Sequence, residues 1–217
     1  MYAFTDLAIA TYCPRKLYYT WADGDRTPPE AVTAIRNLAF RYEELLEPTT
    51  DLSSVPIAVT PTQYRSNLGS AKARLDRWSE LVDPADVRAY LAGKDTNGIA
   101  HKCLANPPAP VIISAGEPPK EGVWKPQSVR ATAAAKALAW ERQAPVEWMY
   151  VEYPAYGIIR KLRVTTRRKA AYRSAFRAVE SLDGPPPRIK NKSRCQPCDY
   201  RETCGITTRS LRSRLSL

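Results

Sequence analysis

The sequence contains no run of about 18 consecutive apolar residues, the length that a membrane-spanning helix needs, so we expect no membrane partner. The stretch MYAFTDLAIATYCPRK carries its basic residues after its apolar ones, the reverse of a secretory signal peptide. These two absences predict a cytoplasmic protein. Apolar residues make up 44% of the 217 positions, as in ordinary globular chains, and this length suits a single domain over 1–217.

Cysteine is sparse, with five residues, and histidine occurs once. In a reducing compartment such cysteines more often bind metal or lie buried than form disulfides. Three of them form the series Cys195-x2-Cys198-x5-Cys204. Thiolates at this spacing are typical of zinc sites and iron–sulfur clusters. A site with four ligands needs one more residue than this series supplies. The candidates for the fourth ligand are Cys13, Cys103 and His101.

The net charge of +11 is concentrated near the C-terminus. Residues 160–217 hold 16 Lys and Arg against four acids, a balance of +12, which leaves the preceding part at −1. A basic segment of this kind is typical of a phosphate-binding surface, so we expect DNA as a partner. The alternative is a solvated cationic face without a partner, and salt-dependent retention on DNA separates the two.

Nine cations of this segment are the predicted DNA contacts. The first five belong to a predicted helix and the others to an extended arm that follows it. In the helix, three of them are spaced four apart and share one face. The set is Arg167, Arg168, Lys169, Arg173, Arg177, Arg188, Lys190, Lys192 and Arg194.

The order of predicted elements indicates an α/β fold, with helices packed on a small mixed sheet. The apolar spacing predicts helices over 6–20, 29–46, 74–81, 83–93, 127–143 and 166–182. Short apolar runs bounded by turn residues predict strands over 110–114, 146–153 and 158–165. Pro14 is expected to break the first helix, and Thr166 to cap the last.

Two motifs at opposite ends of the chain resemble one family. TYCPRKLYY near the start, CQPCDYRETC near the end and the helix–hairpin–helix order between them are similar to the fourth CRISPR-associated protein family. These are iron–sulfur exonucleases with a RecB-like core of the PD-(D/E)XK superfamily. The resemblance implies a 4Fe–4S cluster that joins the two ends through Cys13, Cys195, Cys198 and Cys204. It also implies an N-terminal helical part over 1–47, a nuclease-like core over 96–182, and a basic arm with the cysteine cluster over 183–217.

The catalytic residues of that family are missing from the matching positions. The family uses an Asp and an acid-x-Lys pair on adjacent strands to hold Mg²⁺ or Mn²⁺ and position water. Here the resemblance places His101 at the Asp, Ile112 at the acid and Ser114 at the lysine. It places Thr132 and Lys136 where a Gln-x3-Tyr pair belongs. Isoleucine cannot bind a hard cation, so we expect a degenerate nuclease centre in a protein that still binds DNA.

Two other functions are compatible with the residues. One is an active exonuclease for single-stranded DNA that uses Mg²⁺ or Mn²⁺. Its catalytic set would be Glu117 and Lys120 with Asp95 or Asp76. Glu117 and Lys120 are three positions apart, however, which places their side chains on opposite faces of a strand. The other is an interaction module stapled by zinc. The resemblance implies CRISPR spacer acquisition, with single-stranded or overhanging DNA and the CRISPR integrase as partners, or else a role in DNA repair. His101 fits either a metal ligand, a base or a structural role.

Overall fold

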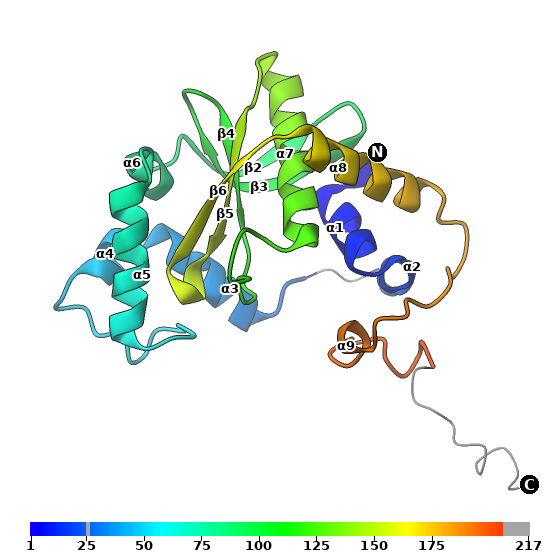
Figure 1. Cartoon of the computed structure of the whole chain (residues 1–217), viewed down its shortest axis with the longest axis horizontal. Helices are drawn as coiled ribbons and strands as arrows, with labels where there is room; N and C mark the ends of the chain where they lie inside the picture. The colour runs from blue at the N-terminus through cyan, green and yellow to red at the C-terminus, as the bar shows by residue number, and fades with distance from the viewer. Residues whose placement is uncertain (25–26, 206–217) are drawn as a thin grey trace, which may run out of the picture.

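A small mixed sheet flanked by helices organises the chain, whose computed structural model describes residues 1–24 and 27–205 (Figure 1). Its strands are β1 (Tyr2–Ala3), β2 (Asp86–Ala92), β3 (Thr96–Leu104), β4 (Ala109–Ile113), β5 (Trp148–Tyr153) and β6 (Ile158–Arg163). Strands β2, β3 and β4 are antiparallel neighbours, β5 runs parallel to β4, and β6 returns antiparallel to β5.

The two edges of β3 are used differently, which leaves a gap in the sheet. Strand β2 pairs along one edge from Asn97 to Cys103. The opposite edge is shared by β1, which pairs in parallel at Thr96 and Asn97, and by β4, whose pairing ends at Lys102. Strands β3 and β4 therefore separate beyond Lys102. The stretch 98–101 of β3 faces this gap.

Three helices cover one face of the sheet, namely α1 (Phe4–Tyr12), α7 (Lys125–Arg142) and α8 (Thr166–Glu180). Helix α7 is rich in buried alanines, and these small side chains allow a close approach to β4 and to α1. Gly98 of β3 is required where α1 begins. It has φ +148°, and an added Cβ would lie 2.8 Å from the Phe4 ring.

The other face carries a second apolar layer. Its helices are α3 (Glu30–Asn37), the 3-10 turn η1 (Leu38–Phe40), α4 (Tyr42–Leu46), α5 (Pro61–Arg74) and α6 (Trp78–Val82). The buried side chains of η1, α4, α5 and α6 pack on Val111, Ile113 and Tyr150 of the sheet, whereas α3 has no buried residue. Helix α2 (Pro14–Asp23) packs on α1.

Several predicted elements are confirmed with shifted ends. The first helix breaks at Cys13, which is extended with φ −162°, and restarts with Pro14 as its first residue. The predicted helix 29–46 is divided into α3, η1 and α4. Strands β4, β5 and β6 and helix α7 lie where the sequence predicts them. The cap of α8 is Thr165, whose hydroxyl accepts from Arg168 N, and the prediction of Thr166 was wrong.

Residues 86–92 form strand β2, and the prediction of a helix over 83–93 was wrong. The alternation of Val87, Ala89 and Leu91 fits β2, and pairing with β3 outweighs the helix-start signal of Asp83-Pro84. Helix α5 and strand β3 also escaped prediction as elements. Thr60 caps α5 by accepting from Gln63 N, and a proline follows it, a signature present in the sequence. Among the described helices none is long and apolar enough to cross a membrane.

Candidate functional site

Four of the five cysteines come together from opposite ends of the chain. Cys13, Cys195, Cys198 and Cys204 line one narrow cavity between α2 and the C-terminal segment that contains α9 (Lys192–Cys195). Figure 1 shows α9 beside α2, far from the sheet. Burial, and then the neighbouring thiols of Cys13, Cys204 and Cys198, raise the pKa of Cys195. Cys103 lies apart from them, buried in β3.

Polar contacts around this cavity fix the C-terminal segment to the first two helices. Tyr12 and Arg194 form a reciprocal pair: the Tyr12 hydroxyl donates to Arg194 O at 2.7 Å, and Arg194 Nη1 donates to Tyr12 O at 3.0 Å. Lys16 Nζ lies 2.9 Å from Asp199 Oδ2. Farther along α2, Tyr19 stacks on Tyr200 with ring centroids 5.4 Å apart. The four cysteines thus lie where α1 and α2 contact the C-terminal segment.

The donor set fits a cluster by its chemistry. Four thiols are the ligands that iron–sulfur clusters take, and a basic rim of Arg15, Lys16, Arg188 and Arg194 offsets thiolate charge. Within residues 1–24 and 27–205, no group of three or more His, Cys, Asp or Glu side chains is spaced to hold a metal ion.

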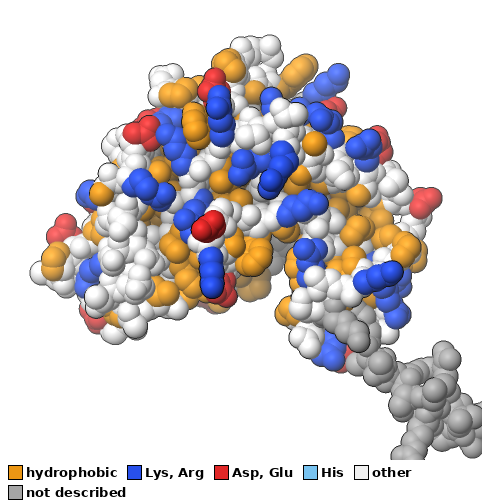
Figure 2. All heavy atoms as spheres, in the orientation of Figure 1, with side chains coloured by type: hydrophobic (Ala, Val, Ile, Leu, Met, Phe, Trp, Pro, Cys, Tyr) orange, Lys and Arg blue, Asp and Glu red, His pale blue; other side chains and the backbone are white. Residues whose placement is uncertain are grey.

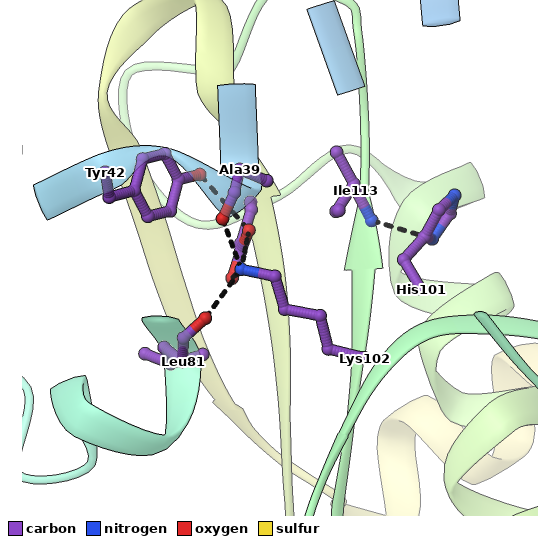
Figure 3. A network of polar contacts seen from close by, with 7 residues as sticks. Ala39, Tyr42, Leu81, His101, Lys102 and Ile113 are labelled. Carbon is purple, nitrogen blue, oxygen red and sulfur yellow. Dashed lines mark hydrogen bonds and ion pairs between the residues drawn. The ribbon is translucent and has the colours of Figure 1, made fainter. Parts of the chain in front are cut away.

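A second group of predicted positions also comes together, at the gap between β3 and β4. His101 stands opposite Ile112 in the continued β3–β4 register, and Ser114 lies two residues beyond Ile112. All three are directed to the α7 side of the sheet, where Gln127 Nε2 of α7 lies 3.4 Å from Ser114 Oγ. The imidazole fills the gap: His101 Nδ1 accepts from Ile113 N at 3.0 Å (Figure 3).

Cations from four helices and strands act on His101. The charges that act on its imidazole are those of Arg130 on α7, Arg36 on α3, Arg88 on β2 and Lys102 on β3. In strand β2, Val87 pairs with Lys102 and Ala89 pairs with Ala100, so Arg88 is opposite His101 in the register. The backbone of Arg88 has φ +53°. Arg88 Nη2 lies 3.5 Å from the Oδ1 of Asn37, the residue after Arg36.

Burial, followed by the surrounding cations, holds the pKa of His101 well below its usual range. The unfolded chain therefore binds the extra proton more readily, and stability that is complete above about pH 6.5 is lost as the pH falls. We expect the free energy of unfolding to fall by at most about 1.4 kcal/mol per pH unit below that point. His101→Asn keeps an acceptor for Ile113 N, and urea unfolding at pH 7 and pH 5 should show a flatter profile for it. An unchanged profile would assign the acid sensitivity to other groups.

The alternative catalytic residues are distributed over separate parts of the surface. Glu117 and Lys120 lie exposed in the loop after β4, and the carbonyls of this loop bind Trp124 and Arg160. Asp95 is exposed in the turn before β3, near Tyr172. Asp76 is paired with Lys161 at 2.9 Å. Thr132 of α7 is buried and donates to Ser128 O, whereas Lys136 lies over the ring of Tyr172.

A fully buried ion pair lies on the opposite side of the sheet from His101. Lys102 Nζ is 3.0 Å from both carboxylate oxygens of Glu152 and donates to Ala39 O and Leu81 O at 2.7 Å (Figure 3). The Tyr42 hydroxyl donates to the same carboxylate at 3.1 Å. Burial, partly offset by Lys102 and Tyr42, raises the pKa of Glu152. Both side chains of the pair have no exposed surface, so the pair is structural.

The predicted DNA contacts divide into exposed and engaged cations. On α8, the exposed residues are Arg167, Lys169, Arg173 and Arg177. Their neighbour Arg168 donates to Arg163 O. Lys125, Arg167 and Arg168 line a hollow of about 810 Å³ where α7 and α8 begin. Figure 2 shows Lys and Arg side chains over this face of the molecule.

The arm contributes fewer free cations. Arg188 and Lys190 are exposed, and Arg188 reaches the cysteine cavity. Arg194 is occupied by Tyr12, so its main contact holds the arm to α1. Lys192 begins α9. The last part of the predicted basic arm, 206–217, lies outside the described residues.

Comparison with protein-family models gives no match, and comparison with curated proteins gives none either. The family resemblance of the cysteine motifs therefore stays a prediction. What the structure adds is geometry, namely the meeting of the four cysteines and the grouping of the degenerate positions at one gap. The sequence did not predict the cations that act on His101 or the ion pair between Lys102 and Glu152. A lysine within the apolar context of β3 was the available signal for the pair.

Proposed function

We propose that this protein is a cytoplasmic iron–sulfur protein that binds DNA and has a RecB-like nuclease fold whose nuclease centre has been lost. The observation that carries the proposal is the convergence of Cys13 with Cys195, Cys198 and Cys204 on one cavity. Cys103 remains in the sheet, in agreement with the ligand set that the resemblance implies.

The cysteine set supports a cluster more than a zinc staple. Four thiols are suitable for either by type, and the resemblance of TYCPRKLYY and CQPCDYRETC to an iron–sulfur family favours the cluster. When bound, a 4Fe–4S cluster supplies iron–thiolate bonds that join the start of α2 to the C-terminal segment. The residues around it shield and orient the thiols, and the cations Arg15 and Lys16 offset their charge.

The loss of the nuclease centre is supported by what occupies the strand gap. A metal-dependent nuclease needs carboxylates at this place, and the side chains present are an imidazole, an isoleucine and a serine. The surrounding charges are arginines, which would repel a divalent cation. A DNA-handling role beside the CRISPR integrase, or in DNA repair, would then depend on binding, with chemistry supplied by a partner.

Protein purified without oxygen tests the cluster. We expect a brown solution with about four irons and four acid-labile sulfides per chain. Zinc without sulfide would contradict the cluster and favour the zinc-stapled module. Incubation with Mn²⁺ and labelled single strands should leave the DNA intact. Degradation that disappears in Glu117→Gln would contradict the loss of the nuclease and favour the active exonuclease.

Binding to single-stranded DNA should depend on salt through the face of α8. We expect the double variant Arg173→Gln/Arg177→Gln to reduce the slope of log K against log salt by about 1.4, since each phosphate contact on a single strand contributes about 0.7. The matched control Arg41→Gln/Lys72→Gln removes the same charge from ion pairs on the other side of the sheet. Fluorescence anisotropy over a salt series gives both slopes. Equal slopes would place the DNA elsewhere.

A further inference from the structure

A hollow of about 620 Å³ lies where the last turns of α7 meet the end of β6 and the start of α8. Small apolar side chains line part of it, among them Ala135 and Ala139 of α7 and Val164 after β6. Val164 N donates to Glu147 O at 2.8 Å, which holds the end of β6 against the segment before β5. We call this cavity the tryptophan hollow, after Trp140 in its lining. Its volume is that of a small-ligand site, which ranges over about 300–1,000 Å³.

Trp140 presents an indole that the protein leaves uncovered. Its side chain follows Lys136 by one helical turn on the same face of α7, and 52% of the residue is exposed. Gln143 Nε2 donates to Trp140 O at 2.6 Å, where α7 ends. Within residues 1–24 and 27–205, no aromatic ring stacks on this indole and no cation lies over it. A flat aromatic face is therefore available to a ligand.

Three cations line the same hollow. Lys136 belongs to α7, Arg163 to β6 and Lys169 to α8, and among the described residues of the lining Glu147 is the one acid, a balance of +2. In the part of the chain that the structure describes, none of the three cations forms an ion pair. Lys136 Nζ lies 5.2 Å from the centroid of the Tyr172 ring, which places this charge between α7 and α8. An anionic ligand would meet uncompensated positive charge beside the exposed indole.

We propose that the tryptophan hollow binds an unpaired base of a single-stranded nucleic acid. The base stacks on Trp140, and the phosphates on either side of it lie beside Lys136 and Lys169. This inference rests on the DNA binding proposed above and names the place and the form of the DNA. An aromatic platform within a cationic groove is the arrangement that holds single strands without reading their sequence. A base inside a duplex is paired and already stacked on its neighbours, so we expect single strands and overhangs to bind more tightly than a blunt duplex.

Fluorescence anisotropy with a labelled oligothymidylate tests the contribution of the indole. Trp140→Ala is expected to weaken binding by about fivefold or more, the effect of losing one stacked base, and Trp140→Phe should retain most of the affinity. Because the indole carries no charge, Trp140→Ala should leave the slope of log K against log salt unchanged, whereas Lys169→Gln should reduce it by about 0.7. The matched control is Trp124→Ala, which should bind as the wild-type protein does. Trp124 is 51% exposed and precedes the other end of α7.

Photo-crosslinking locates the base directly. An oligothymidylate with one 5-iododeoxyuridine should become joined, on irradiation, to the peptide that contains Trp140, as identified by mass spectrometry. A crosslink elsewhere would overturn the inference even if Trp140→Ala failed to fold. So would equal affinities of Trp140→Ala and Trp124→Ala in a protein that binds the strand, a result that leaves the proposed function in place. Wild-type protein that binds no single strand would contradict both. Thymidine monophosphate that binds as tightly as the oligonucleotide would show a site for free nucleotides instead of a strand.

Discussion

Lys102→Met is expected to lower the free energy of unfolding by about 3–5 kcal/mol, the largest effect of any single change considered for this chain. The substitution leaves the Glu152 carboxylate with no exposed surface and no cation, in contact only with the Tyr42 hydroxyl. It also removes the donors that satisfy two backbone carbonyls, Ala39 O and Leu81 O. Chemical denaturation followed by circular dichroism measures the loss.

The double variant Lys102→Met/Glu152→Met should recover much of that stability, because two apolar side chains of similar volume replace a buried ion pair. Lys72→Met provides the matched control. Its ion pair with Glu43 at 2.6 Å is about half exposed, so we expect a change of less than about 1 kcal/mol. If Lys102→Met and Lys72→Met had similar effects, the buried pair would not be holding the two layers together.

Cys13→Ser is expected to remove nearly all of the bound iron and the visible colour. Serine keeps the size of the side chain but lacks the soft sulfur donor. The loss should also loosen the C-terminal segment, whose remaining ties are side-chain contacts such as Tyr12–Arg194 and Lys16–Asp199. Limited proteolysis should then cleave within 183–205 faster than in the wild-type protein.

The matched control is Cys103→Ala, because burial raises the pKa of that thiol to about 11 and keeps it protonated within β3. Iron content and protease resistance of the C-terminal segment should be unchanged in this variant. Full retention of iron by Cys13→Ser would show that other residues complete the ligand set. The proposed family and function would then lose their main support.

Sequence patterns predicted the elements whose signals are local. The apolar run of β4, the hairpin of β5 and β6 and the alanine-rich α7 each lie within two residues of their predicted bounds. The break at Cys13 follows from Pro14, because proline supplies no backbone donor to a continuous helix. The series Cys195, Cys198 and Cys204 was visible because its spacing is short, whereas Cys13 was linked to it only by the family resemblance.

Other features depend on pairing between distant segments. Strand β2 has a helix-start sequence, but β3 offers it a complete row of backbone partners, which decides its conformation. The charge of Arg36 acts on Arg130, although the two residues are far apart in the sequence. A local sequence pattern therefore cannot predict this interaction. The gap that His101 fills results from β1 and β4 sharing one edge of β3.

The contact between Tyr12 and Arg194 joins residues 182 positions apart, which has a consequence for how the protein is made. A ribosome adds about 5–20 residues per second, so the first partner emerges on the order of 10–40 s before the second. The sheet can form during that interval, since its last strand ends at Arg163. The nascent protein therefore closes its two ends last, after the sheet has had time to form.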